Sequence, residues 1–220
     1  MTAGEARRGH FAQMWYDGGT ISYLRFMAPG TIAIAIMYMA FFETTYGSFI
    51  RMYYQRTFDA IVATPLLVED VIVGEWLWGA TKSALASAIM LVMIGLFGLV
   101  SWPAGVLVVP IAFLGGFLFS ALGLVATALV PTIDAFNVTT FVLVFPMSLF
   151  GGTFLPIETF PAWARTVALA LPITHVSRLA RGACLGDAPP AWGWSVGYLI
   201  VVAFATSAAA LVLMRRRLVK

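Results

Sequence analysis

Three acidic side chains, Glu69, Asp70 and Glu75, lie close together in the sequence and could in principle hold a hard cation such as Mg²⁺. No histidine lies near them, and Glu75 stands apart from the other two. The spacing therefore favours a solvated acidic patch over a metal centre.

Residues 74–83, GEWLWGATKS, resemble the phosphate-binding loop GxxxxGK[ST] at first sight. In that loop the lysine directly follows the second glycine, so that it reaches the β- and γ-phosphates while backbone amides hold the rest. Here Ala80 and Thr81 separate Gly79 from Lys82, and two tryptophans would crowd the loop. This segment is not predicted to bind ATP.

The chain has two histidines, His10 and His175, and one cysteine, Cys184. The histidines lie far apart in the sequence, and nothing near His175 completes a zinc or catalytic set. We therefore predict a structural capping role for His175, and no catalytic residue or metal ligand in the chain.

Composition places these residues in a membrane protein. Hydrophobic residues make up 61% of the 220 positions and charged residues 10%, with a mean hydropathy of +0.92. Soluble domains average about 45–50% apolar and about 25% charged residues. A soluble globular domain is therefore excluded.

Five neutral, apolar segments are near the length of about 20 residues that a helix needs to cross a membrane. They are residues 26–42, 83–101, 106–130, 135–157 and 192–214. The second and third are separated by a turn rich in Pro and Gly at 101–105. Small residues at Ala112, Gly116 and Ser120 predict close helix packing. The predicted fold class is an all-α polytopic membrane protein with about five spans.

Basic residues near span ends favour the cytoplasmic side, and the tail at 215–220 is rich in them. This places the C-terminus and residues 46–82 in the cytoplasm, and residues 1–25 and 158–191 outside. The Arg7-Arg8 pair then lies outside, which a translocated terminus normally avoids. Either the topology is inverted or the start of the chain is unusual.

Glu43 lies near the cytoplasmic end of the first predicted span. Charges inside a membrane mark proton relays and ion paths, so their scarcity here argues against a proton-coupled transporter. Glu43 either snorkels to the interface or contributes to gating or substrate contact.

Residues 49–63 show two repeating patterns. Apolar side chains recur about every fourth position from Ile50, and polar side chains recur every fourth position from Arg51. The pattern predicts one amphipathic helix that ends at Thr64-Pro65 and is too short and too charged to span. It is either an interfacial connector or a docking helix for a cytoplasmic partner.

Residues 161–171 and 176–185 are predicted to form two short apolar helices, with a break at Pro172–His175. Each is too short to cross a membrane, so the pair fits a re-entrant hairpin on the outer side.

Several short motifs, taken in order, resemble the permease subunits of type-2 ABC exporters, and within them the nodulation protein J group. They are GGTISYLRFMAPG at 18–30, ETTYGSFIR at 43–51, QRT at 55–57, GEW at 74–76, ATK at 80–82, FLP at 154–156, LPITH at 171–175 and RRRL at 215–218. Their order and spacing from about residue 15 to the C-terminus make the resemblance specific.

The resemblance implies a dimeric exporter in which each permease pairs with a separate cytoplasmic ATPase. The amphipathic segment then corresponds to the family's coupling helix, whose ATPase-coupling residues are Arg51, Gln55, Arg56, Thr57 and Asp59. The family's re-entrant helices correspond to the outer hairpin, with Pro156, Pro161, Pro172 and His175. Candidates for gating or an interface are Glu43, Glu75, Pro172 and His175.

The start of the chain departs from the family, whose members have six spans and a cytoplasmic N-terminus. Residues 1–14 take the place of the first span here, so we hypothesise a truncated or mis-started permease. The predicted domains are an extracytoplasmic segment at 1–25 and an ABC-2 type transmembrane domain at 26–220.

The sequence thus predicts a permease subunit of an ABC exporter in a bacterial inner membrane, without catalysis or a cofactor of its own. Its substrate is expected to be an amphiphile such as a lipo-oligosaccharide or another lipid-linked or drug-like molecule. The expected partners are a cytoplasmic ATPase, a second permease copy and membrane lipid, but not nucleic acid. The alternative is a non-transporting scaffold or assembly factor derived from a truncated permease.

Overall fold

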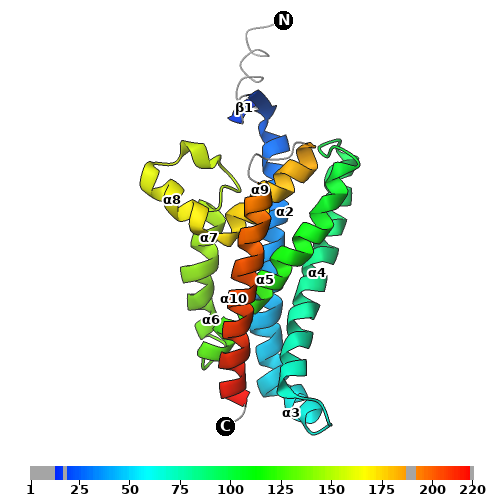
Figure 1. Ribbon diagram of the computed structural model, residues 1–220, viewed down its shortest axis with the longest axis vertical. Helices are drawn as coiled ribbons and strands as arrows, with labels where there is room; N and C mark the ends of the chain where they lie inside the picture. The colour runs from blue at the N-terminus through cyan, green and yellow to red at the C-terminus, as the bar shows by residue number, and fades with distance from the viewer. Residues whose placement is uncertain (1–12, 17–18, 187–191, 219–220) are drawn as a thin grey trace, which may run out of the picture.

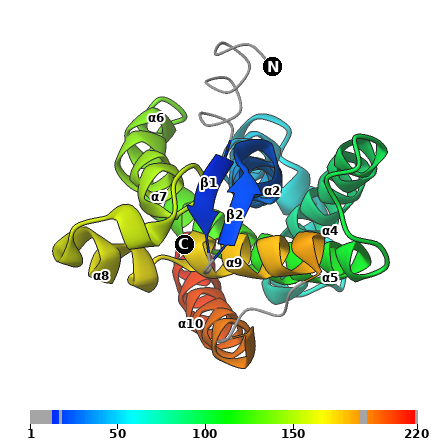
Figure 2. The ribbon, with the colours of Figure 1, turned by 90° about the horizontal axis from the view of Figure 1, so that it is seen from above.

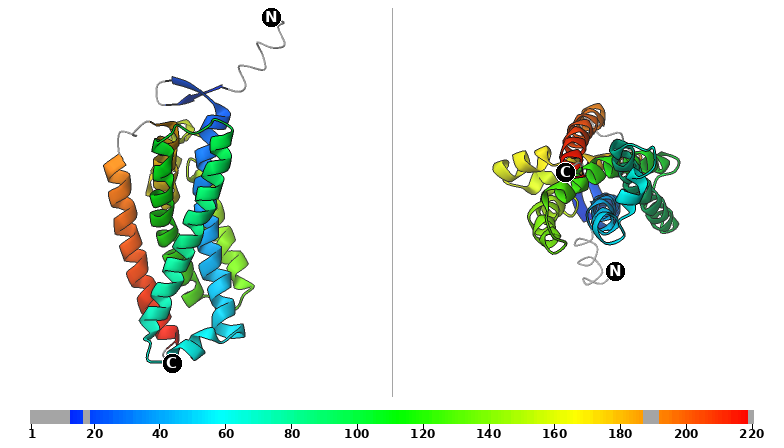
Figure 3. Two further views of the ribbon diagram at one scale, coloured as in Figure 1. Left: turned by 90° about the vertical axis from the view of Figure 1, so that its right-hand side faces the viewer. Right: turned by 90° about the horizontal axis from the view of Figure 1, so that it is seen from below.

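The computed structural model describes residues 13–16, 19–186 and 192–218. Four helices in these ranges are long and apolar enough to cross a membrane: Tyr23–Tyr54, Val68–Leu96, Ala104–Leu129 and Trp192–Leu218. They run along the long axis of the molecule and pack against one another (Figures 1 and 3). The prediction of a helical, polytopic membrane fold is confirmed.

The first long helix consists of α2 (Tyr23–Phe42) and a continuation in which two π-helical segments occur, at Glu43–Gly47 and Ile50–Tyr54. The helices that follow are α3 (Thr57–Val62), α4 (Val68–Leu96), α5 (Val108–Leu129), α6 (Ala135–Thr139), α7 (Phe145–Phe150), α8 (Ala162–Ala170), α9 (Pro172–Leu185) and α10 (Trp192–Leu218). Short connecting helices are Ala104–Leu107, Thr140–Val144 and Ile157–Thr159.

A small β-hairpin, which the sequence analysis did not predict, precedes the first long helix. Strands β1 (Gln13–Tyr16) and β2 (Gly19–Ser22) pair in antiparallel register, with Gln13 opposite Ser22. The hairpin lies beyond α2, at the same end of the bundle as α8 and α9 (Figures 1 and 2). We call this the hairpin end.

The opposite end carries α3 and the last described residues of α10, and we call it the α3 end (Figure 1). The connection at 55–67 and the described end of α10 therefore share one end, while the described residues of the outer segment at 158–191 lie at the other. The charge pattern predicted that these segments lie at two opposite ends, but residues 46–54 and 68–82, which it placed in the cytoplasm, belong to helices long enough to span.

The fourth predicted span, 135–157, is shorter than expected. The apolar helix there runs from Ala135 to Phe150, which is about 24 Å at 1.5 Å per residue and less than the roughly 30 Å of a bilayer core. It ends because Gly151 follows and Gly152 adopts a left-handed conformation with φ of 66°. The expected five spans are thus four long helices and one short one.

The single amphipathic helix expected at 49–63 was a wrong prediction. Residues up to Tyr54 continue the first long helix, and only Thr57–Val62 form the separate helix α3. Arg56 stands between them with φ of 50°, a left-handed conformation that cannot continue a right-handed helix.

Helix α4 begins at Val68, well before the predicted start at residue 83. The Asp70 carboxylate accepts the backbone N–H of Leu67 at 2.9 Å and so satisfies a donor at the helix start. The polar segment before Lys82 is therefore the first part of a spanning helix.

Helices α2, α4 and α5 approach closely through small residues. Gly116 lies against Ser83 of α4, and Gly123 lies against Thr44 of the first long helix. Ala112 and Ser120, on the same stripe of α5, are fully buried. The close packing predicted from this stripe is confirmed, and it holds α4 and the first long helix at fixed positions beside α5.

Candidate functional site

A network of charged side chains joins the first long helix to α4 near the α3 end. Arg51 donates from Nε to Oε1 of Glu75 at 2.9 Å and from Nη2 to Oε2 at 2.5 Å. Its Nη1 also donates to Oε1 of Glu43 at 3.1 Å, and Lys82 Nζ donates to Oε2 of Glu43 at 2.8 Å. Two acids and two bases therefore balance each other.

Neutral donors complete the same network. Ser48 Oγ donates to Oε2 of Glu75 at 2.5 Å, and Trp78 Nε1 donates to Oε1 of Glu43 at 3.0 Å. The side chains of Glu43 and Glu75 are only 15% and 11% exposed. Carboxylates enclosed to this degree need partners for their charge. Glu75 therefore does not belong to a solvated acidic patch, and Glu43 is ion-paired within the protein.

Two π-helical segments position the network on the first long helix. Eight residues of a regular α-helix turn by about 800°, which would leave Glu43 and Arg51 roughly 80° apart around the axis. The wider turns at Glu43–Gly47 and Ile50–Tyr54 add residues to each turn and bring both side chains to the side facing α4.

The other residues predicted to couple to an ATPase lie beyond this helix. Gln55 and Arg56 are exposed in the turn before α3, and Thr57 is its half-buried first residue. The side chain of Asp59 lies outside the described residues. Arg51 is thus separated from the other predicted coupling residues, because its guanidinium is held in the ion network. Docking by these residues remains a prediction.

At the hairpin end, His175 ties α9 to α8 and α10. Its Nε2 lies 3.1 Å from the carbonyl oxygen of Leu169, and its Nδ1 lies 3.1 Å from Oγ of Ser195. Burial lowers the pKa of His175, which favours a neutral ring. Nε2 then donates to the carbonyl, and Nδ1 accepts from the serine. The ring also stacks on Tyr198 with centroids 4.1 Å apart.

Pro172 is the first residue of α9, where its missing N–H costs nothing. Leu171 separates α8 from α9, and Thr174 Oγ1 donates to the carbonyl of Ala168 at 2.5 Å. The predicted division into two short helices is confirmed, but the break is at Leu171. Residues 172–175, which were expected to form the break, are the first turn of α9.

Arg181 is the buried cation of α9, with 3% exposure. Its Nη2 donates to the carbonyl of Gly152 at 3.0 Å, and its guanidinium lies 3.8 Å from the ring centroid of Phe26. These contacts fasten α9 to α2 and to the loop that follows α7.

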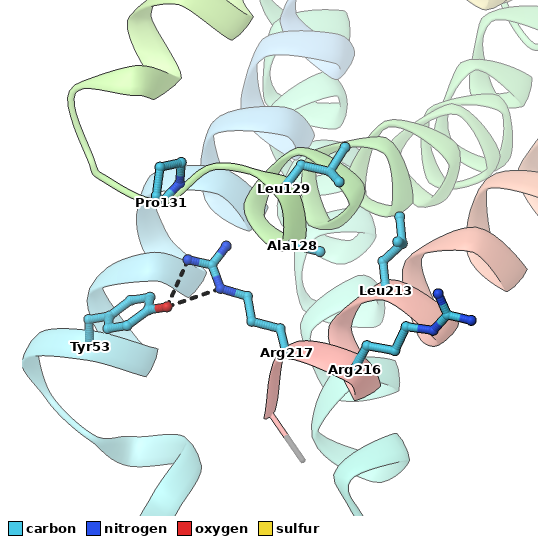
Figure 4. Close-up of a pocket in the computed structure, with 7 residues that line it drawn as sticks. All are labelled: Tyr53, Ala128, Leu129, Pro131, Leu213, Arg216 and Arg217. Atoms are coloured by element: carbon cyan, nitrogen blue, oxygen red, sulfur yellow. Dashed lines mark hydrogen bonds between the residues drawn. The ribbon is translucent and has the colours of Figure 1, made fainter. Parts of the chain in front are cut away.

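A pocket of about 450 Å³ opens at the α3 end, between the ends of α5 and α10 (Figure 4). Arg217 Nη2 donates to the hydroxyl of Tyr53 at 2.7 Å. Its Nη1 donates to the carbonyls of Thr127 and Val130. Arg217 thereby joins α10 to the end of α5 and to the first long helix.

The sequence analysis missed Ser48, Trp78, Lys82 and Arg217 as site residues. A signal for two of them existed, since Glu75, Trp78 and Lys82 recur on α4 at spacings of three and four that place side chains on one helix face. Among the described residues, no cluster of three or more His, Cys, Asp or Glu side chains could hold a metal ion.

The sequence of this chain is similar to those of known membrane transporters. The sequence profile described as ABC-2 type transporter matches residues 9–185. Nodulation protein J of Rhizobium leguminosarum bv. viciae is 36% identical over 203 residues, covering 91% of this chain and 77% of that protein. The corresponding protein of R. leguminosarum bv. trifolii is 37% identical over 205 residues, covering 92% and 77%.

A more distant relative is the inner membrane transport permease YadH of Escherichia coli K12. It is 28% identical over 190 residues, covering 83% of this chain and 72% of that protein. The family profile and the two nodulation proteins agree with the helical bundle and its apolar spans. The chain therefore belongs to the ABC-2 type transporter family, as a multi-pass membrane permease subunit similar to nodulation protein J.

Proposed function

We propose that this permease works as an exporter, driven by a separate cytoplasmic ATPase that docks at the α3 end. Two permease copies would form the path, and the substrate would be an amphiphile such as a lipo-oligosaccharide or another lipid-linked or drug-like molecule. The α3 end, with the C-terminus, would face the cytoplasm of a bacterial cell, and the hairpin end would face outward from the inner membrane.

The observation that carries the docking proposal is the exposed tip of the connection between the first long helix and α4. Tyr54, Leu66 and Leu67 are 69%, 51% and 65% exposed, and the exposed Arg56 belongs to the same connection. The segment from the end of the first long helix to the start of α4, which includes α3, lies at the end of the bundle (Figure 3). A concentration of exposed apolar side chains beside a cation supports a protein interface at this tip.

The ion network supplies a route by which movement of the tip would reach the spans. The helix that enters the tip carries Arg51, and the helix that leaves it carries Glu75, so their two-pronged pair joins both helices next to α3. Pressure on α3 would therefore move the first long helix and α4 as one unit. Such paired motion is what a permease needs to open a path at an interface between two copies.

The resemblance to the nodulation protein J group supports the amphiphilic substrate. The described interiors of the long helices hold few ionisable groups, and these are paired with one another near one end. An ion-relay mechanism would need such groups along a path. The scarcity of charge therefore favours a cargo with a large apolar part.

The test is ATP-driven transport in inverted membrane vesicles that contain this chain and an ABC ATPase subunit from the same organism. Accumulation of a lipo-oligosaccharide or a fluorescent amphiphile inside the vesicles is expected with ATP and not with a non-hydrolysable analogue. A chain that recruits no ATPase and moves no amphiphile under these conditions would refute the proposal.

A further inference from the structure

Two adjoining pockets at the α3 end carry positive charge, and of their three arginines the proposed function uses only Arg56. The larger, of about 450 Å³, is lined by Leu213, Arg216 and Arg217 of α10, by Ala128, Leu129 and Pro131 at the end of α5, and by Tyr53 (Figure 4). The smaller, of about 310 Å³, shares Tyr53 and Arg217 with it and adds Arg56. Arg216 thus lines the larger pocket, Arg56 the smaller, and Arg217 both.

These charges have no acidic counterpart in the part of the chain that the structure describes. No carboxylate lines either pocket, and neither Arg216 nor Arg217 forms an ion pair there. Arg217 donates to the Tyr53 hydroxyl and to two backbone carbonyls and lies over the rings of Phe49 and Tyr53, so most of its donors are engaged within the protein and Arg216 is the more available cation. The preceding Arg215, by contrast, pairs with Glu69 at 3.4 Å.

We propose that the larger pocket binds the phosphate group of an anionic phospholipid. Guanidinium groups match phosphate oxygens in both charge and hydrogen-bond geometry. The pocket lies where α5 and α10 end, so the phosphate would meet the exposed Arg216 while an acyl chain follows Leu213 and Leu129. Basic clusters at the ends of spans are suited to lipid headgroups in this way.

The apolar wall favours a lipid over the other anions that could reach this site. Leu129 is 65% exposed, and an acyl chain would cover it. Inorganic phosphate would use the arginines and leave the wall empty, and an acidic protein surface docked on the end of the bundle would not extend along the spans. The occupant is thus a molecule with an anionic head and an apolar tail.

The experiment measures lipid binding to the purified full chain in detergent, without an ATPase, by native mass spectrometry. Phosphatidylglycerol is expected to bind more tightly than phosphatidylcholine. Arg216→Gln is the test variant because Arg216 is exposed and makes no ion pair among the described residues. It should weaken phosphatidylglycerol binding by about fivefold, the effect of one basic residue near a membrane surface.

The matched control is Arg215→Gln, which removes the same charge from the same helix turn but does not line the pocket. It should leave phosphatidylglycerol binding within about twofold of the parent value. Equal losses in the two variants would indicate bulk attraction, and equal binding of the two lipids by the parent chain would indicate no headgroup site; either overturns the proposal.

Two further measurements distinguish a bound lipid from free phosphate and from an acidic protein surface. Displacement of phosphatidylglycerol by millimolar inorganic phosphate would show that the site recognises a free anion, which overturns the lipid assignment. A loss of ATPase co-purification with Arg216→Gln, together with unchanged lipid binding, would assign the pocket to a protein partner and overturn it as well. Because the lipid measurement uses no ATPase, its outcome is independent of whether the proposed transport occurs.

Discussion

Arg51 and Glu75 lie 24 residues apart in the sequence and meet through two parallel N–H···O bonds of 2.9 and 2.5 Å. The pair spans the two helices that lead into and out of α3. A bidentate guanidinium–carboxylate contact fixes both distance and orientation, unlike a contact between point charges. The two helices are therefore joined at the level of this pair as well as through the chain itself.

Replacing Arg51 by Gln should lower the stability of the bundle. Removal of one partner from a buried ion pair costs about 3–5 kcal/mol, and since the Arg51 side chain is 24% exposed we expect roughly 1–3 kcal/mol here. The loss arises because Glu75 keeps its charge and retains only Ser48 as a partner. Thermal unfolding of the purified chain in detergent measures it.

The control for that variant is the double substitution Arg51→Gln with Glu75→Gln. It removes the unpaired carboxylate as well, so the double variant should unfold at a higher temperature than Arg51→Gln alone. The two residues act independently if Glu75→Gln lowers the stability of the Arg51→Gln variant by as much as it lowers that of the parent chain.

Reversing the charge of Arg56 should weaken association with the ATPase. Arg56 is exposed, lies in the turn before α3 and belongs to no described ion pair, so Arg56→Glu changes the surface without opening the network. A loss of about fivefold in co-purified ATPase is expected, which corresponds to about 1 kcal/mol. Arg165→Glu on exposed α8, at the hairpin end, is the control and should change nothing.

The spacing of apolar residues and the positions of proline and of small residues were enough to predict much of the fold. The apolar segments located the long helices, and Pro172 located the break between α8 and α9 because a proline suits only the first turn of a helix. The small residues around Gly116 indicated close packing of helices, which the structure shows against Ser83.

The site was less accessible to sequence reasoning, because its contacts join residues of different helices. The stripe that begins at Ile50 looks the same whether the segment is a separate surface helix or a wider-turned continuation of a span. Local sequence carries no signal for the π-helical turns or for the left-handed Arg56, so residues 49–63 were read as one helix. The side chains that pair with Glu43 and Glu75 can be identified only when the packing of α2 and α4 on α5 is known.

Gly30 and Gly74 should respond in opposite directions to replacement by Ala. Both lie inside helices, where Ala is favoured over Gly by about 1 kcal/mol in water. A Cβ on Gly30 would overlap the backbone carbonyl of Thr153 and approach its carbon to 3.1 Å, whereas a Cβ on Gly74 would have no neighbour within 4 Å.

We therefore expect Gly30→Ala to destabilise the bundle by about 1–3 kcal/mol, since the clash is with backbone that cannot rotate away. Gly74→Ala should be neutral or slightly stabilising. Thermal unfolding of both variants in the same detergent checks the pair, and a Gly30→Ala variant as stable as Gly74→Ala would contradict the close approach of α2 to the loop after α7.

Replacing His175 by Ala should loosen the hairpin end without affecting the α3 end. The variant leaves the Leu169 carbonyl without its ring donor and removes the stacking on Tyr198, at an expected cost of about 1–3 kcal/mol. His175→Gln, whose amide can still donate one bond, should lose less. Faster hydrogen exchange in α8 and in the first turns of α10, with unchanged exchange in α3, is the expected readout.

The paired removal of Arg51 and Glu75 separates docking from transmission. The double Gln variant leaves the exposed tip at Tyr54, Leu66 and Leu67 intact, so the ATPase should still co-purify at the parent level. Without the bidentate bond, however, movement of α3 would no longer carry the first long helix and α4 together, and ATP-driven transport should fall by about tenfold or more, a loss of about 1.4 kcal/mol in coupling. Arg56→Glu should behave differently: it should reduce co-purification of the ATPase, and transport should fall in proportion to that loss. If the double Gln variant transports at the parent rate, the ion network holds the helices together but does not transmit the movement of α3.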